Sequence, residues 1–227
     1  PILPGHRNAR LYAGITIGNC GANSAEGAEI IVKHAGLMKA LISCLANGFD
    51  ELQETTVVAL KNCAASSQEA AYIVAHSNEA LALIQGFVLH KNRSRLHDVA
   101  VGAINCISRS PRAVPRLRQM GLSKVFEERL WAENSGEDSE LHKMTLACAV
   151  VNIECVNLEA SDVHTSRGVA LQRWILGQDG KKTMTHMVKC LGFALRDVQW
   201  NHVSFSPHSV ICPLNNLTRT FPSSDLQ

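Results

Sequence analysis

Aromatic residues are scarce in this chain, at 5% of 227 residues, although 46% of the residues are hydrophobic. The chain is long enough to bury a substantial core, so alanine, valine, leucine and isoleucine must supply most of it. Small aliphatic side chains suit close packing of helix on helix better than a cavity built around a large ligand. We therefore expect a packed protein that holds no cofactor.

A strong excess of one charge is also missing, because 22 Lys and Arg residues face 20 Asp and Glu residues for a net charge of +2. We expect no nucleic-acid partner, since such proteins concentrate basic charge on one face. No apolar run reaches the roughly 18 residues of a membrane span. The nearest basic cluster is interpreted as a solvated helix edge, with contact to an acidic partner as the alternative. It comprises Arg109, Arg112, Arg116, Arg118, Lys124 and Arg129.

Cysteine spacing argues against both disulfides and CxxC chemistry. Of the eight cysteines, Cys20, Cys63 and Cys106 recur at one position of a repeat, and others lie in apolar helical runs. Cysteines placed in this way behave as small buried hydrophobes. The chain shows no recognisable signal peptide, so we expect a reducing, intracellular and cytoplasmic setting.

Motifs for catalysis or metal binding are weak. The pairs His186/Cys190 and His208/Cys212 have helical spacing and could in principle bind zinc, but we interpret them as core cysteines and surface histidines. No cysteine is marked as an activated nucleophile. We predict no enzyme activity and no metal site. A metal protein or enzyme using these C-terminal residues is one alternative.

A glycine-rich stretch near the N-terminus, Gly14-x-x-x-Gly18-x-x-Gly21, is a second weak motif. No strand precedes it and no phosphate-loop lysine follows it. Tight helix packing explains these glycines better than a phosphate site does.

The dominant feature is a repeat. The stretch QETTVVALKNCAAS, residues 53–66, is echoed by LYAGITIGNCGANS, HDVAVGAINCISRS and MTLACAVVNIECVN. Their asparagines, Asn19, Asn62, Asn105 and Asn152, are 43, 43 and 47 residues apart. Such a period is typical of a helical solenoid.

Glycine and polar breaks divide each repeat into a short helix, a second helix and a longer third helix. We expect a loop over 1–8 and a third-type helix over 10–20. Three full units follow, in which an acidic loop over 133–140 lengthens the last spacing. Their helices are expected at 25–34, 37–46 and 53–66, then 67–76, 80–89 and 95–108, then 111–120, 122–132 and 142–156.

The predicted domain organisation follows from these units. A partial unit covers 9–23, and full units cover about 24–66, 67–109 and 110–157, so that 1–157 forms the repeat region. A divergent helical cap is predicted over 158–203 and an irregular tail over 204–227.

This three-helix unit, with glycine after the first helix and Leu-x-Asn near the end of the third, resembles the armadillo repeat. Residues 34–66, HAGLMKALISCLANGFDELQETTVVALKNCAAS, carry the resemblance most strongly, and it covers about 9–157. It implies an all-α fold, a right-handed superhelix whose third helices line a concave groove. It also implies that Asn19, Asn62, Asn105 and Asn152 bind the backbone of a peptide, because an amide both donates and accepts. Alternatively, these asparagines bridge neighbouring turns.

The departures from the family narrow its function. Nuclear-import adaptors of this family carry tryptophan four residues before the asparagine, where this chain has Ile15, Val58, Val101 and Cys148. We therefore do not expect a nuclear-localisation-signal receptor. Catenin-like members use basic groove positions, of which Lys61 is the one match.

The resulting hypothesis is non-catalytic binding of a protein or peptide. The partner would lie across Asn62, Lys61, Asn105 and flanking side chains, Val58 and Val101 among them. The second alternative is a structural subunit of a large cytoskeletal or ciliary assembly, held by its convex face and tail. The sequence does not indicate an oligomeric state.

Overall fold

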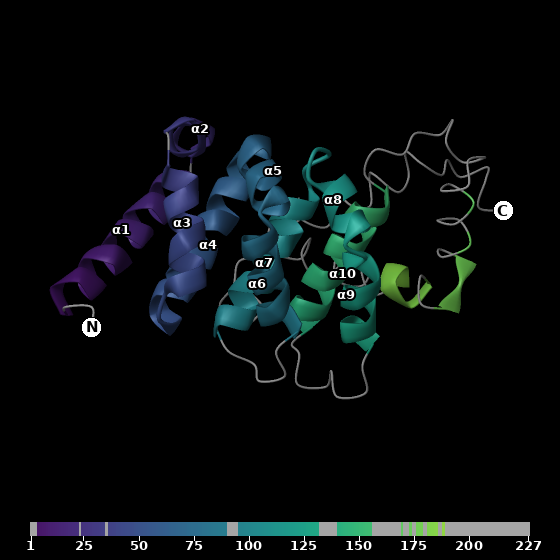
Figure 1. The fold of residues 1–227 in the computed structure, drawn as a ribbon. Coiled ribbons are helices and arrows are strands. Elements are labelled where there is room, and N and C mark those ends of the chain that lie inside the picture. The colour runs from purple at the N-terminus through teal and green to yellow at the C-terminus, as the bar shows by residue number, and fades with distance from the viewer. Residues whose placement is uncertain are drawn as a thin grey trace. The chain divides into compact units, whose positions relative to one another are not determined.

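A computed structural model describes residues 4–22, 24–34, 36–89, 95–131 and 140–155, together with 169, 173, 176–178, 181–185 and 188. These residues contain ten named helices and no strand, so the described chain is all-α (Figure 1). The helices are α1 (Pro4–Ala22), α2 (Ala25–Lys33), α3 (Leu37–Asn47), α4 (Asp50–Ser66), α5 (Gln68–His76), α6 (Asn78–Leu89), α7 (Arg95–Ser108), α8 (Val114–Gln119), α9 (Leu122–Trp131) and α10 (Glu140–Cys155).

The breaks between these helices have the local chemistry that the sequence indicates. Gly36 and Gly121 have φ angles of 94° and 66°, in the left-handed region that glycine enters at little cost. Ser24 caps α2, since its hydroxyl accepts a hydrogen bond from the Gly27 N–H at 3.0 Å. Ser67 caps α5 in the same way, accepting from the Ala70 N–H. The predicted turns and most helix bounds are confirmed to within a few residues.

Two local predictions are wrong. The predicted leader loop over 1–8 is helical from Pro4, because proline is well suited to the first position of a helix, where its missing N–H costs nothing. The predicted short helix over 111–120 is reduced to α8, since residues 111–113 form a turn. Residue 132 and the part of the acidic loop over 133–139 lie outside the described residues.

The chain divides into two compact units, Pro1–Arg116 and Leu117–Gln227, called here the N-terminal and C-terminal units. The division falls within the third predicted repeat. The boundary of the predicted repeat region at 157, and the predicted cap and tail, stay predictions, because most of 158–227 lies outside the described residues.

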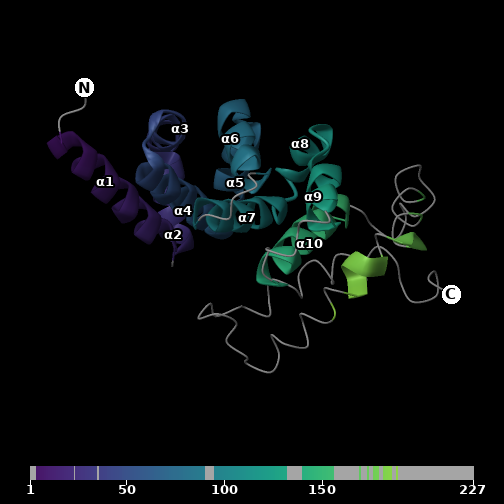
Figure 2. The same ribbon diagram turned by 90° about the horizontal axis from the view of Figure 1, so that it is seen from below.

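Like helices pack on like helices in the N-terminal unit. Three rows of contacting helices result: α1–α4–α7, α2–α5 and α3–α6. Figure 2 shows α3 and α6 on one side of this unit and α4 and α7 on the other. Helix α4 lies at the centre, and its Leu52, Val57 and Leu60 are fully buried. The predicted aliphatic core is confirmed here.

The C-terminal unit has its own apolar core. Helices α9 and α10 pack together. Phe126 and Leu130 of α9 and Leu146 and Ile153 of α10 are buried. None of the described helices is both long enough and apolar enough to cross a membrane.

Candidate functional site

The glycine motif of α1 is the surface that packs against α4. A Cβ atom built on Gly14 would lie 3.1 Å from Thr55 Cγ2, and one on Gly18 would lie 3.4 Å from the Cα of Ala59. A Cβ on Gly21 would come within 2.8 Å of Cys63 Sγ, closer than real contacts allow. The prediction that these glycines serve helix packing is confirmed.

The close approach of α1 and α4 determines what Asn62 does. Its Nδ2 donates a hydrogen bond to the Gly18 carbonyl oxygen at 3.1 Å. One turn later, Ser66 Oγ donates to the Gly21 carbonyl oxygen at 3.0 Å, one of the last carbonyls of α1 that has no partner within its own helix. Asn62 therefore joins the neighbouring helices α4 and α1 by a hydrogen bond. This is the bridging role that the sequence left open beside peptide binding.

The next interface, between α4 and α7, uses the same repeat positions with different residues. At the repeat position that Gly18 occupies in α1, helix α4 carries Lys61. At the position that Ala59 occupies in α4, helix α7 carries Gly102. A Cβ on Gly102 would meet the Lys61 side chain at 3.3 Å, so the stem of Lys61 packs on α7. Asn105 is 4% exposed, and its Oδ1 has no hydrogen-bond partner among the described residues.

A hollow of about 390 Å³ lies between α1 and α4, and Asn19 is among the residues that line it. Leucine, isoleucine and valine contribute its apolar part, and the two glycines of α1 deepen it. Ile15 is 40% exposed there although it is a large apolar side chain. The lining residues are Leu11, Gly14, Ile15, Gly18 and Asn19 of α1, Glu51, Glu54, Thr55 and Val58 of α4, and Arg95 of α7.

Two carboxylates of α4 stand at the edge of this hollow. Glu54 pairs with Arg95 Nε at 2.8 Å, and Glu51 pairs with Arg7 Nη2 at 2.8 Å. Arg7 also lies over the ring of Phe49, 4.0 Å from its centroid. The pKa of Glu51 is below its ordinary value, because a backbone N–H and then the Arg7 guanidinium hydrogen-bond its carboxylate. Glu51 is therefore charged at neutral pH.

The structure distributes the predicted partner-binding residues unevenly. Asn19 and Val58 line the hollow. Asn62 and Lys61 are half-buried, with the contacts described above. Val101 and Asn105 are buried and offer a partner little surface, and Asn152 is fully buried in the C-terminal unit. Their part in binding stays a prediction.

Sequence reasoning missed the polar edge of the hollow. Glu51, Glu54 and Val58 recur at helical spacing on one face of α4, and this pattern could have marked them. The position of Arg95 had no such signal, because it depends on how α7 packs beside α4.

Of the three repeated cysteines, Cys63 is buried and Cys106 is partly buried, whereas Cys20 is exposed. The prediction of a small buried hydrophobe is therefore wrong for Cys20. Cys63 is fully buried, and burial, followed by the nearby Cys20, raises its pKa to about 11. Burial also raises the pKa of Cys106, although Arg109 and Lys61 act in the opposite direction. A raised pKa leaves little thiolate at neutral pH, so neither residue is suited to nucleophilic chemistry.

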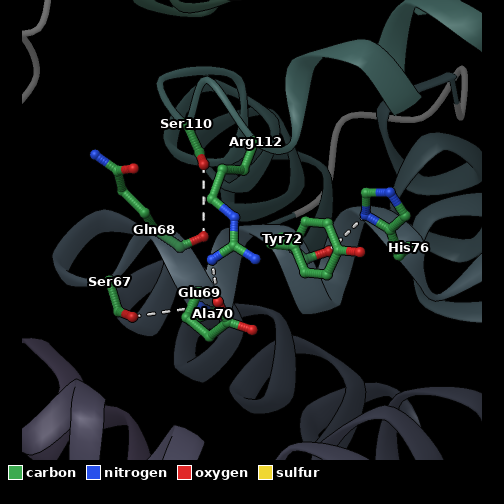
Figure 3. Close-up of polar contacts among 8 residues, drawn as sticks. All are labelled: Ser67, Gln68, Glu69, Ala70, Tyr72, His76, Ser110 and Arg112. Atoms are coloured by element: carbon green, nitrogen blue, oxygen red, sulfur yellow. Dashed lines mark hydrogen bonds and ion pairs between the residues drawn. The ribbon is translucent and has the colours of Figure 1, made fainter.

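Arg112 of the basic cluster noted in the sequence makes contacts within the N-terminal unit, shown in Figure 3. Arg112 pairs with Glu69 and lies over the ring of Tyr72, 4.5 Å from its centroid. Ser110 Oγ donates to the Gln68 carbonyl oxygen at 3.5 Å. These bonds attach 110–112 to α5. Arg112 is solvated as predicted, but it lies in a turn and not on a helix, and contact of the cluster with an acidic partner stays an untested alternative.

No group of three or more potential metal ligands lies within the described part of the chain. The two histidine–cysteine pairs, His186/Cys190 and His208/Cys212, fall outside it. Comparisons with known protein families, with curated proteins and with solved structures find no match for this chain.

Proposed function

We propose that the chain is an armadillo-like, right-handed solenoid that binds a segment of a partner protein in the hollow between α1 and α4. The protein acts by binding and not by catalysis. The observation that carries the proposal is the hollow of about 390 Å³ with the large apolar side chain of Ile15 standing exposed at its wall.

The helix rows support the architecture. A stacked three-helix repeat produces rows of like helices, a repeat of 43 residues, and contacts at the same repeat positions of the α1/α4 and α4/α7 interfaces. A reducing, intracellular setting belongs to the proposal, since Cys20, Cys44, Cys63, Cys106 and Cys148 are free thiols.

The lining suggests the chemistry of the partner segment. An apolar side chain would fill the space beside Leu11, Ile15 and Val58. A lysine or arginine nearby in the segment would bind Glu54 in place of Arg95, whose side chain is 80% exposed. Exchange of one ion pair for another at the surface costs little, because surface pairs contribute about 0–1 kcal/mol.

The test begins with selection of peptides from a displayed random library on the parent chain. The dissociation constant of a selected peptide is then measured for the parent and for two variants, Ile15→Arg and Ile30→Arg. Both isoleucines are exposed on the N-terminal unit, but Ile30 lies on α2 and does not line the hollow. Ile30→Arg is therefore a matched control for the charge and for the lost apolar surface.

We expect Ile15→Arg to weaken binding at least tenfold, about 1.4 kcal/mol, and Ile30→Arg to leave it within twofold. Equal affinity for the parent and Ile15→Arg would contradict the proposal, as would a library that yields no binder. Loss of binding in Ile30→Arg alone would instead favour attachment through the outer face, as in a structural subunit.

A further inference from the structure

The two ion pairs at the edge of the hollow differ in how firmly their arginines are held. Arg7 pairs with Glu51 at 2.8 Å and also lies over the ring of Phe49, 4.0 Å from its centroid. Arg95 pairs with Glu54 at 2.8 Å, and 80% of its side chain is exposed. Displacement of Arg7 would therefore give up a ring contact as well as an ion pair, whereas displacement of Arg95 would give up an ion pair with a mostly exposed guanidinium.

The position of Arg95 is explained by the hollow and not by its own helix. Arg95 is the first residue of α7 and lines the hollow, which Arg7 does not. The start of a helix carries unpaired backbone N–H groups and the positive end of the helix dipole, so a cation there does not stabilise the helix. The interaction that accounts for this side chain is its pair with Glu54.

The carboxylate of Glu54 needs a cation more than that of Glu51 does. The Glu54 side chain is 25% exposed, against 64% for Glu51. A carboxylate that is mostly withdrawn from water is costly to leave unpaired, and a segment seated in the hollow withdraws it further. A ligand that displaces Arg95 therefore has to bring a cation of its own.

We propose that Arg95 is a built-in competitor of the partner segment. In the free chain it occupies the place beside Glu54 that a lysine or arginine of the segment takes in the complex. This inference rests on the proposed function and adds regulation to the same site. It also fixes where the basic residue of the segment binds: beside Glu54, on the side of the hollow that α7 lines, and not beside Glu51.

A competitor of this kind hides the preference of the site for basic segments. When a basic residue displaces Arg95, one ion pair is lost and one is formed, so the parent chain gains little affinity from that residue. Removal of Arg95 leaves Glu54 without its cation. The same basic residue then adds an ion pair without breaking one, and its effect on affinity becomes measurable.

The test starts from one selected peptide whose binding is lost in Ile15→Arg, and it places lysine at each position of the peptide in turn. Dissociation constants are measured for the parent chain, Arg95→Ala, Arg95→Lys and Arg7→Ala. Arg7→Ala is the matched control, because it also removes an arginine that pairs with a carboxylate of α4 at 2.8 Å. Circular dichroism checks that each variant is helical.

We expect at least one lysine position that tightens binding to Arg95→Ala by about threefold or more, and to the parent chain by less than twofold. Arg95→Lys should behave like the parent chain, because it restores a competing cation. The gain should vanish when Glu54→Gln is added to Arg95→Ala, since the lysine then has no carboxylate to bind. At the same peptide position, Arg7→Ala should match the parent chain.

The inference is overturned if no lysine position gains on Arg95→Ala, if the gain survives Glu54→Gln, or if Arg7→Ala shows the same gain. A glutamate in the peptide that tightens binding to the parent chain but not to Arg95→Ala would also overturn it, because Arg95 would then bind the ligand itself. In each of these cases the Ile15-dependent peptide still binds, so the proposed function stands. If no selected peptide depends on Ile15, the proposed function fails and this inference falls with it.

Discussion

The interfaces α1/α4 and α4/α7 use the same repeat positions but are built differently. At α1/α4, Gly18 meets Ala59 and the backbones approach closely, so that Asn62 reaches a carbonyl of α1. At α4/α7, the stem of Lys61 meets Gly102, and the Oδ1 of the equivalent asparagine, Asn105, has no hydrogen-bond partner among the described residues. The repeat therefore keeps an asparagine at this position but does not keep the hydrogen bond that the asparagine makes to the neighbouring helix.

This difference bears on how a repeated polar residue is interpreted. A side-chain amide reaches a neighbouring backbone only where small residues let the helices come close. Asn62 meets that condition through Gly18, whereas the bulk of Lys61 occupies the equivalent position in the next interface. A repeated asparagine is thus no sufficient sign of a ligand contact.

The largest expected contrast is in the reactivity of two cysteines at the same repeat position, Cys20 of α1 and Cys63 of α4. Cys63 is fully buried with a pKa of about 11, whereas Cys20 is exposed. At pH 8 a thiol with that pKa is about one part in a thousand thiolate, and burial also blocks access. We expect iodoacetamide to modify Cys20 at least a hundredfold faster than Cys63, as measured by mass spectrometry of timed samples.

The same thiol predicts a pH dependence. A folded-state pKa above the ordinary value means that the folded chain holds this proton more tightly than the unfolded chain does. The contribution of Cys63 to stability is therefore complete below about pH 9 and falls as pH rises toward 11. In the iodoacetamide experiment described above, comparable labelling of Cys63 and Cys20 in the folded chain would contradict the close α1/α4 contact.

A second contrast comes from adding one methyl group at each interface. Gly21→Ala places a Cβ against the sulfur and backbone of Cys63, so we expect the free energy of unfolding to fall by about 1–3 kcal/mol. Gly102→Ala meets only the flexible stem of Lys61, and alanine is the better helix former by about 1 kcal/mol.

Gly102→Ala should therefore be neutral or stabilising. Urea denaturation of both variants, followed by circular dichroism, measures the two changes. Equal losses at the two sites would show that the interfaces are alike.

Much of the fold could be predicted from local signals. Some turns and caps depend only on neighbouring residues, so the sequence predicts them. Examples are the glycine turns at Gly36 and Gly121 and the serine cap at Ser67. The start of α1 was missed because Pro4 and Gly5 together resemble a loop, although proline also suits the first turn of a helix. The aliphatic composition predicted helix-on-helix packing correctly.

The candidate site was less predictable. Asn19 and Val58 line the hollow, but their part in partner binding stays a prediction. The pairing of Glu54 with Arg95 joins residues 41 positions apart, and it depends on the separation of α4 and α7. The partner of Asn62 likewise depends on the glycines of another helix. Distances between helices arise from packing, and a single sequence does not display them.

The most direct test of the account measures stability and peptide affinity together in Asn62→Ala, with Asn105→Ala as the equivalent change at the next interface. Loss of the bond to Gly18 should lower the free energy of unfolding of Asn62→Ala by about 1 kcal/mol, while a peptide selected on the parent chain binds the folded variant within twofold. Asn105→Ala should cost less than Asn62→Ala, because its Oδ1 has no hydrogen bond to lose among the described residues. Unchanged stability with a tenfold loss of affinity in Asn62→Ala would contradict the account, since Asn62 would then contact the ligand instead of joining α4 to α1.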